Sequence, residues 1–140
     1  GCGFSKETYI EQMVDLIDFQ INVDKEVIVQ LLRNREEMMS TAIGHGISLP
    51  HPRIPLMVGR DKPLLAFFFL KDPIDLDAID GKPVHTIVLL ISQTIKQHLS
   101  LLAHLSFLLL DKDLRHSLEN RLDYETISGI ISRIESERRA

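Results

Sequence analysis

Residues 84–91 read VHTIVLLI, an almost unbroken apolar run with the length of one strand. A strand with one face in water alternates apolar and polar side chains, whereas a strand covered on both faces is apolar throughout. Residues 64–70, LLAFFFL, show the same continuous pattern. The two runs therefore predict strands of a sheet that is covered on both faces.

The neighbouring segments predict a turn between these two strands and a further short strand before them. Residues 72–83, DPIDLDAIDGKP, form a long polar stretch with Asp80-Gly81, a pair that is typical of turns. On the N-terminal side, the short apolar stretch 46–49 stops at Pro50, which has no backbone N–H to donate to a sheet. We expect a short strand there.

Helices are expected before and after the strands, because apolar residues recur there at intervals of three and four. Their ranges are 5–17, 23–39, 94–110, 111–122 and 123–139, with N-cap residues Ser5, Asp24, Thr94, Asp111 and Asp123. Helices around apolar strands predict an α/β domain whose sheet lies between helix layers.

The composition limits the class of protein. The 140 residues have the length of one domain, and we expect residues 1–140 to form one. A formal charge of −4 gives no electrostatic reason to expect direct contact with nucleic acid or an anionic membrane. The one cysteine, Cys2, fits a reducing compartment. The longest apolar run is too short to span a bilayer. We therefore expect a soluble, cytoplasmic protein without membrane insertion.

Six histidines raise the question of a metal site. Zinc ligands are usually paired closely in sequence or held in a cysteine knuckle. His98 and His104 are six residues apart, which is about 240° of rotation around a helix, so they face different ways. His45 and His51 are separated by a glycine turn and a strand. We expect no bound metal.

Four histidines have structural explanations. His45 lies in a Gly-His-Gly turn, where a polar residue that tolerates positive φ is expected. His85 lies in an apolar strand and is expected to be a hydrogen-bonded core or edge residue. His104 and His116 are expected on helix surfaces without a partner.

His51 differs because it stands between Pro50 and Pro52. Proline fixes its own φ, and the residue before a proline is held in an extended conformation. The backbone on both sides of this imidazole is therefore restricted. Two interpretations remain open: an imidazole prepared for nucleophilic or acid–base chemistry near neutral pH, and an ordinary histidine in a proline-rich loop.

Two further residues are placed to meet an anion. His98 falls in the first turn of an expected helix, where free N–H groups and the helix dipole favour negative charge. Arg35 follows Ile28, Leu31 and Leu32 on the apolar stripe of another helix, where a guanidinium is costly unless it meets an anion. The alternative for Arg35 is a side chain that reaches past its own stem to water.

Residues 35–53, REEMMSTAIGHGISLPHPR, resemble the active-site signature of the fructose/mannitol/nitrogen-type (type 2) enzyme IIA domains of the bacterial phosphoenolpyruvate phosphotransferase system. Residues 72–85, DPIDLDAIDGKPVH, and 97–109, QHLSLLAHLSFLL, resemble two later blocks of that family. The blocks follow in order, and the resemblance as a whole covers the chain from about Arg35 to Leu118. The resemblance implies a mixed central β-sheet flanked by helices on both faces.

The resemblance also implies a role for each matched residue. His51 matches the phosphoryl-accepting histidine, with Nε2 as the acceptor atom. His98 matches a second active-site histidine that positions the phosphoryl group, and Arg35 matches an arginine that lines the same pocket and stabilises charge. Backbone N–H groups around Gly44 and Gly46 would form a phosphoryl-binding loop. No metal or organic cofactor is required.

The chain departs from the family pattern in four places. His45 replaces a commonly polar residue and adds a further titratable group near the expected pocket. Ala42 stands where the family usually has glycine, and Ser48 where it usually has alanine; both are small enough for the turn to survive. Family domains begin with a strand before the first helix, but this chain opens GCGFSKET, almost directly at a helix. We expect that strand to be shortened or absent, as in an excised part of a longer protein.

The implied partners depend on the role of the domain. The donor would be the phosphorylated histidine-carrier protein. Residues 84–94 and 51–55 resemble the nitrogen-type branch, which favours a regulatory role with a regulated protein as target. Two alternatives stay open: a sugar-transport component that passes the phosphoryl group to a IIB domain, and a phosphorylation-switched protein-binding module of a transcriptional regulator.

Overall fold

The computed structural model describes residues 3–19, 23–53, 55 and 63–139 of the chain. The chain divides into two compact units, Gly1–His98 and Leu99–Ala140. The first unit contains the helices α1 (Tyr9–Leu16) and α2 (Lys25–Met38), the strands, and the first turn of α3 (Ile95–Leu108). The rest of α3 forms the second unit together with α4 (Lys112–Glu119) and α5 (Tyr124–Arg139).

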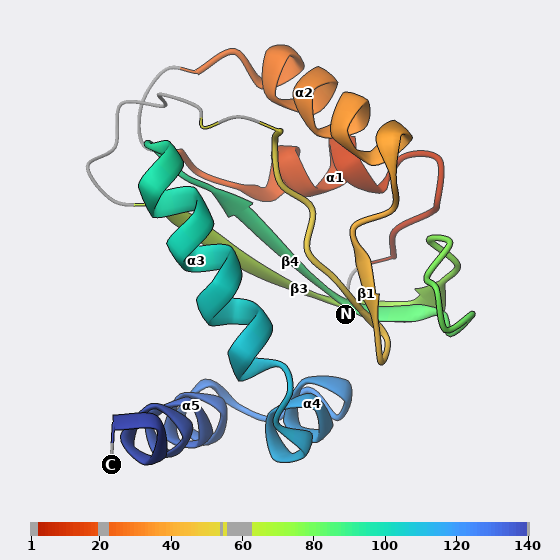
Figure 1. Cartoon of the computed structure of the whole chain (residues 1–140). Helices are drawn as coiled ribbons and strands as arrows, with labels where there is room; N and C mark the ends of the chain where they lie inside the picture. The colour runs from red at the N-terminus through yellow and green to blue at the C-terminus, as the bar shows by residue number, and fades with distance from the viewer. Residues whose placement is uncertain (1–2, 20–22, 54, 56–62, 140) are drawn as a thin grey trace. The chain divides into compact units, whose positions relative to one another are not determined.

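Within the described residues, a four-stranded sheet forms the centre of the first unit (Figure 1). Its strands are β1 (Ala42–Gly44), β2 (Ile47–Ser48), β3 (Leu64–Ile74) and β4 (Val84–Ile91), in the spatial order β1-β2-β4-β3. β2 runs parallel to β4, with Ile47 opposite Thr86, whereas the other two pairs are antiparallel. The predicted α/β fold with a mixed sheet is confirmed.

Burial differs between the two long strands. β4 is buried along its length except at His85, as its continuous apolar sequence predicts. β3 alternates instead: Phe68 and Leu70 are buried, whereas Leu65 and Phe67 are 40% and 36% exposed. The expectation that both strands are covered on both faces is therefore wrong for β3. An apolar run does not show how far other elements extend over each face.

α1 and α2 pack together on one face of the sheet and close a hydrophobic core (Figure 1). The core joins side chains of both helices to inward-facing residues of β3 and β4, including Met13, Val14, Leu32, Leu70, Ile87 and Leu89. Burying one aliphatic side chain of this size stabilises the fold by about 1.5–3 kcal/mol. The core therefore holds α2 against the sheet through Ile28 and Leu32.

The predicted N-cap residue is confirmed for α2 and wrong for α1. Asp24 caps α2 as predicted, because its carboxylate accepts the backbone N–H of Glu26 at 3.1 Å. Ser5 does not cap α1, contrary to the prediction. That helix begins at Tyr9 with Thr8 at the N-cap position, and the hydroxyl of Ser5 lies 2.6 Å from the hydroxyl of Thr8. The two hydroxyls bond to each other instead of to free helix N–H groups.

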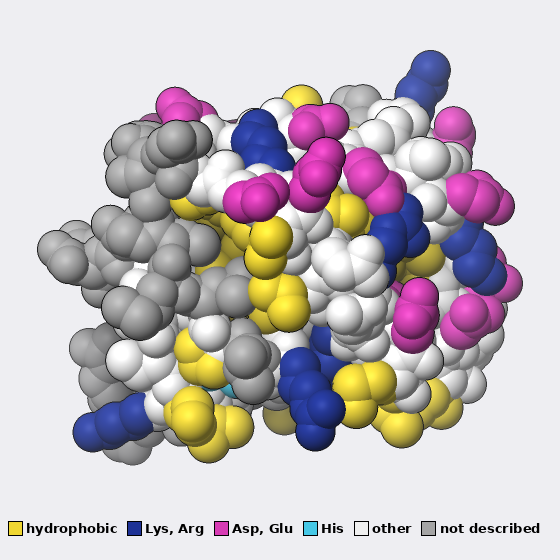
Figure 2. Space-filling model, turned by 90° about the horizontal axis from the view of Figure 1, so that it is seen from above, with side chains coloured by type: hydrophobic (Ala, Val, Ile, Leu, Met, Phe, Trp, Pro, Cys, Tyr) yellow, Lys and Arg dark blue, Asp and Glu magenta, His cyan; other side chains and the backbone are white. Residues whose placement is uncertain are grey.

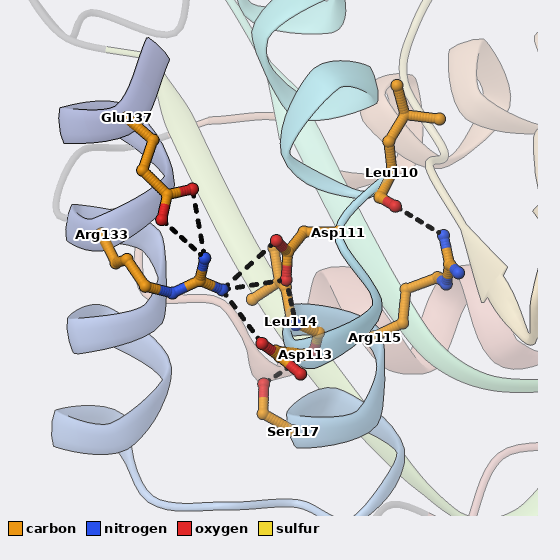
Figure 3. Close-up of polar contacts among 8 residues, drawn as sticks. All are labelled: Leu110, Asp111, Asp113, Leu114, Arg115, Ser117, Arg133 and Glu137. Carbon is orange, nitrogen blue, oxygen red and sulfur yellow. Dashed lines mark hydrogen bonds and ion pairs between the residues drawn. The ribbon is translucent and has the colours of Figure 1, made fainter. Parts of the chain in front are cut away.

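In the second unit, Arg133 joins α5 to the start of α4 (Figure 3). Its guanidinium donates to Asp111 and Asp113 at 3.2 Å each, and to Glu137 one turn further along α5. Asp111 also caps α4 as predicted, accepting the backbone N–H of Leu114 at 3.0 Å. One carboxylate thus serves both the start of a helix and a bond between two helices.

The helix-surface histidines of this unit have partners, contrary to the prediction. His104 Nε2 lies 3.8 Å from the carboxylate of Glu135 in α5. His116 Nδ1 lies 3.2 Å from the side-chain amide of Asn120, four residues further along the chain. The first contact joins two helices, so the periodicity of one helix could not have shown it.

The surface gives no sign of a large basic patch on the face shown in Figure 2. Acidic and basic side chains are interspersed there with apolar ones over the described residues. Among the described helices, none is long and apolar enough to cross a membrane.

Candidate functional site

His51 and His98 lie side by side in the first unit. Their ring centroids are 5.2 Å apart and the ring planes are inclined by 55°. His51 belongs to the segment after β2, and His98 lies in the first turn of α3. The fold therefore brings together two residues that the sequence singled out separately.

Hydrogen bonds hold the backbone before His51 from two sides. The N–H of Leu49 donates to the carbonyl of Thr41 at 3.0 Å. The carbonyl of Pro50 accepts the N–H of Leu90, near the end of β4, also at 3.0 Å. The prolines restrict the torsions of this segment, and these two bonds fix its position against the sheet.

The ring of His51 has one defined tautomer. Its Nδ1 lies 2.7 Å from the carbonyl oxygen of Leu49. A carbonyl oxygen can only accept a hydrogen bond, so Nδ1 carries the proton and Nε2 keeps a free lone pair. Burial lowers the pKa of His51; the Leu49 bond opposes this, and the charges of Arg35 and His98 add to the lowering. His51 is therefore a neutral base near pH 7, with Nε2 as its nucleophilic atom.

His98 is held inside the protein with 8% of its surface exposed. Its Nδ1 lies 2.9 Å from the hydroxyl of Ser92, the residue that follows β4. Burial lowers the pKa of His98, so this ring is also neutral near pH 7. Thr94 caps α3 as predicted, and its carbonyl accepts the N–H of His98 at 2.9 Å. The cap and the hydroxyl together set the orientation of the ring.

Ser92 is missed by the sequence reasoning above. The signal for it is a single hydroxyl directly after a fully apolar strand, six residues before a histidine at a helix start. Such a residue is buried with the end of the strand and needs a polar partner there. A nearby histidine is a suitable one.

Arg35 lies half-buried in the last turn of α2. Its Nη1 donates to the carbonyl of Met39 at 2.8 Å, which satisfies an oxygen at the end of the helix. The positive charge of Arg35 contributes to the lowered pKa of His51. Its role as a charge that stabilises a phosphoryl group stays a prediction, as does the alternative of a side chain that reaches past its own stem to water.

The turn that holds Gly44 and Gly46, the expected phosphoryl-binding loop, bonds to a different part of β4 from the His51 segment. With His45 between them they form the tight turn that joins β1 to β2, and all three have positive φ, of 92°, 57° and 79° in chain order. The carbonyl of Gly46 accepts the N–H of His85 at the start of β4, whereas the His51 segment pairs with the end of that strand. At about 3.3 Å per residue, roughly 13 Å of sheet separates the two places. The turn has a structural role in joining β1 to β2, and its assignment as a phosphoryl-binding loop stays a prediction.

Two neighbouring imidazoles, one of which has a free ring nitrogen, form an arrangement that can accept an anionic group. His51 offers a lone pair for bond formation, and Arg35 offers positive charge. Among the described residues, no group of three His, Cys, Asp or Glu side chains is arranged to hold a metal ion.

Residues 3–134 match the family model described as phosphoenolpyruvate-dependent sugar phosphotransferase system, EIIA 2. The chain belongs to this family of type 2 enzyme IIA domains. The resemblance seen in residues 35–53 is thereby confirmed. As an enzyme IIA domain of a phosphotransferase system, the chain is a phosphotransfer protein.

Relatives of this enzyme IIA domain carry two kinds of name. The nitrogen regulatory protein of Pseudomonas aeruginosa is 33% identical over 132 residues, which are 92% of this chain and 84% of that protein. The fructose-specific EIIABC component of the Bacillus subtilis phosphotransferase system is also 33% identical over 132 residues. Those residues are 91% of this chain but 20% of that longer protein.

Among solved structures, the nitrogen regulatory protein IIA-Ntr from Neisseria meningitidis shares this fold. Its TM-score is 0.77 at 29% sequence identity, and the alignment covers 93% of this chain and 88% of that one. The enzyme IIA fold that the sequence implied is therefore the observed one.

Proposed function

We propose that this enzyme IIA domain, with residues 1–140 acting as one functional domain, accepts a phosphoryl group on Nε2 of His51. The donor is the phosphorylated histidine-carrier protein of the phosphotransferase system, in the cytoplasm. One observation carries the proposal: the 2.7 Å bond from Nδ1 of His51 to the carbonyl of Leu49. It leaves Nε2 as the ring nitrogen with a lone pair, which is the acceptor atom that the family resemblance implies.

The transfer balances without a proton leaving His51. The lone pair of Nε2 attacks the phosphorus of the donor phosphohistidine in line, and the new N–P bond forms as the donor's N–P bond breaks. The donor imidazole keeps the electron pair of the broken bond. Because Nδ1 of His51 retains its proton, the phosphorylated ring is positively charged, and the Leu49 carbonyl stabilises it through a charge-assisted hydrogen bond.

Positioning and charge supply most of the catalysis in this scheme. The transition state of phosphoryl transfer is loose, and its negative charge is spread over three equatorial oxygens. Arg35 stabilises that charge, and His98, with its ring centroid 5.2 Å from that of His51, is placed to orient one oxygen. No metal or organic cofactor enters the reaction.

We assign the domain a nitrogen-type regulatory role, supported by relatives named nitrogen regulatory protein. At His51 the phosphoryl group brings nearly two negative charges against the one positive charge of the phosphorylated ring, and this net gain of about one negative charge is enough to change the affinity for a regulated protein. The fructose-specific relative of equal identity favours the alternative, in which His51 passes its phosphoryl group to a IIB domain. Incubating the phosphorylated domain with a fructose-type IIB domain separates the two roles, because only a transport component loses its phosphoryl group rapidly.

Intact-mass spectrometry tests the central proposal. The domain is incubated with phosphoenolpyruvate, the general phosphotransferase enzyme and the histidine-carrier protein. We expect one acid-labile phosphoryl adduct on the wild type and on His45→Ala, which changes an exposed histidine in the turn, and none on His51→Ala. An adduct on His51→Ala, or none on the folded wild type, would refute the assignment.

A further inference from the structure

Glu36 follows Arg35 in α2, and none of the roles assigned above explains the hydrogen bonds that its carboxylate makes. Its carboxylate accepts two different groups of Thr41: the backbone N–H at 3.0 Å and the side-chain hydroxyl at 2.8 Å. The hydroxyl of Tyr9 donates to the same carboxylate at 3.4 Å. Burial and the negative charge of Glu36 raise the pKa of Tyr9, as expected for a phenol held against a carboxylate.

Thr41 is buried and tightly bound on its other side as well. Its hydroxyl oxygen lies 3.2 Å from the hydroxyl of Ser48, which is fully buried in β2. Because the single hydroxyl proton of Thr41 goes to Glu36, Ser48 is the donor in this second bond. The peptide group and the side chain of Thr41 are therefore both fixed in place by a charged acceptor.

From Thr41 a continuous series of bonds leads to the His51 ring. The carbonyl of Thr41 accepts the N–H of Leu49 at 3.0 Å. The carbonyl of Leu49 in turn accepts Nδ1–H of His51 at 2.7 Å. The N–H of Leu49 is bonded to Thr41, so the position of Thr41 sets the orientation of Leu49. A shift of Thr41 would therefore turn the Leu49 carbonyl away from the His51 ring.

We propose that Glu36 is a positioning residue for His51: its carboxylate holds Thr41 so that the Leu49 carbonyl stays aimed at Nδ1 and leaves Nε2 free. The proposal rests on the phosphoryl-acceptor role of His51. Glu36 itself does not touch the reacting atoms. Its function is to keep the acceptor ring in one tautomer, because the partner of one ring nitrogen determines the state of the other.

The chain offers a closely matched control. Glu37 is the next residue of the same helix, is exposed, and carries the same charge. Glu36→Gln and Glu37→Gln therefore change the net charge equally, but only the first replaces a carboxylate that accepts from Thr41. A glutamine amide offers one accepting oxygen, and its NH₂ group would meet the donors of Thr41 unfavourably.

Nitrogen NMR of the unphosphorylated protein at pH 7.5 reads the tautomer directly. In the wild type and in Glu37→Gln we expect His51 to be protonated at Nδ1 alone. In Glu36→Gln we expect a mixture of both tautomers, together with phosphorylation by the phosphorylated histidine-carrier protein that is about ten- to a hundredfold slower. An unchanged tautomer in Glu36→Gln would overturn the proposal, as would the same change in Glu37→Gln.

The test still gives an answer if Glu36→Gln does not fold or if His51 is not the phosphoryl acceptor. If Glu36→Gln does not fold, Thr41→Val retains the backbone N–H and removes only the hydroxyl; a partial shift of the His51 tautomer supports the proposal, and no shift overturns it. If the wild type itself is not phosphorylated, the proposed function fails, while the NMR result still decides whether Glu36 controls the ring. A slower transfer with an unchanged tautomer would show that Glu36 is only structural.

Discussion

The hydroxyl of Ser92 and Nδ1 of His98 lie 2.9 Å apart, and both side chains are buried. A buried ring nitrogen without a hydrogen-bond partner is costly, so this contact sets how the second imidazole faces His51. The bond links the end of β4 to the first turn of α3. The orientation of His98 thus depends on a residue outside the pair of imidazoles.

Replacing Ser92 with alanine should weaken both the fold and the site. The buried Nδ1 of His98 loses its partner, which costs about 1–3 kcal/mol of unfolding free energy. We expect slower phosphorylation of His51 but an unchanged final extent, since the acceptor remains. Urea denaturation and initial rates measure the two effects. Ser92→Thr keeps the hydroxyl and is the control; equal rates for Ser92→Ala and the wild type would show that His98 holds its orientation without the bond.

Arg35→Ala should slow phosphoryl transfer without a large loss of stability. The Arg35 side chain is half-buried, and under the proposed role its loss removes one positive group that stabilises the developing negative charge, which typically costs about 10²–10³ in rate. Stopped-flow transfer from the phosphorylated histidine-carrier protein gives the rate. Arg35→Lys retains the positive charge and should keep part of the wild-type transfer rate. A normal rate with a lowered melting temperature would instead mean that Arg35 is a helix-end residue that reaches for water.

Both active-site rings should stay neutral as the pH falls below the usual range of histidine. The pKa of His51 and that of His98 are lowered in the folded protein, mainly by burial. The unfolded chain therefore takes up protons near pH 6.5 that the folded protein does not, so stability should decrease as the pH drops through about 6.5. Between pH 7.5 and pH 5.5 the free energy of unfolding should decrease less in the double variant His51→Gln/His98→Gln than in the wild type. Ring-proton NMR titrations with midpoints at or above 6.5 would contradict this.

Gly46→Ala should destabilise the fold. A Cβ at Gly46 would collide with the ring of His85, and the φ of 79° is already strained for any residue with a side chain. Backbone strain alone costs about 1–3 kcal/mol. Gly129→Ala in α5 is the control, since a Cβ there meets nothing within 4 Å. Thermal denaturation should separate the two variants; equal melting temperatures would mean that the His85 ring moves aside freely.

Removing the Arg133 side chain should loosen the second unit alone. Arg133→Ala breaks the bonds from α5 to Asp111 and Asp113 (Figure 3). We expect faster amide hydrogen exchange in α4 and α5 and no change in β4. Lys112→Ala, which removes an exposed positive charge from α4, should leave exchange as in the wild type. The prediction fails if both variants exchange alike.

Local rules were sufficient for much of the fold. Asp24, Thr94 and Asp111 cap helices at the predicted places, and the continuous apolar sequence of residues 84–91 forms the buried strand β4. These features depend on neighbours within four residues or on the pattern of one strand. Where a residue had a competing local partner, as Ser5 has in Thr8, the same rules failed.

The sequence by itself determined the family and the helix and strand types. It also singled out His51, because the two flanking prolines act on the residues next to them. Only the tertiary structure decided which atoms meet. It placed His98 beside His51, gave Ser92 and Glu36 their partners, and bonded Gly46 to the start of β4 and Pro50 to its end. The reason is physical: strand register and hydrogen bonds between distant segments set distances across the sheet, and no local pattern contains them.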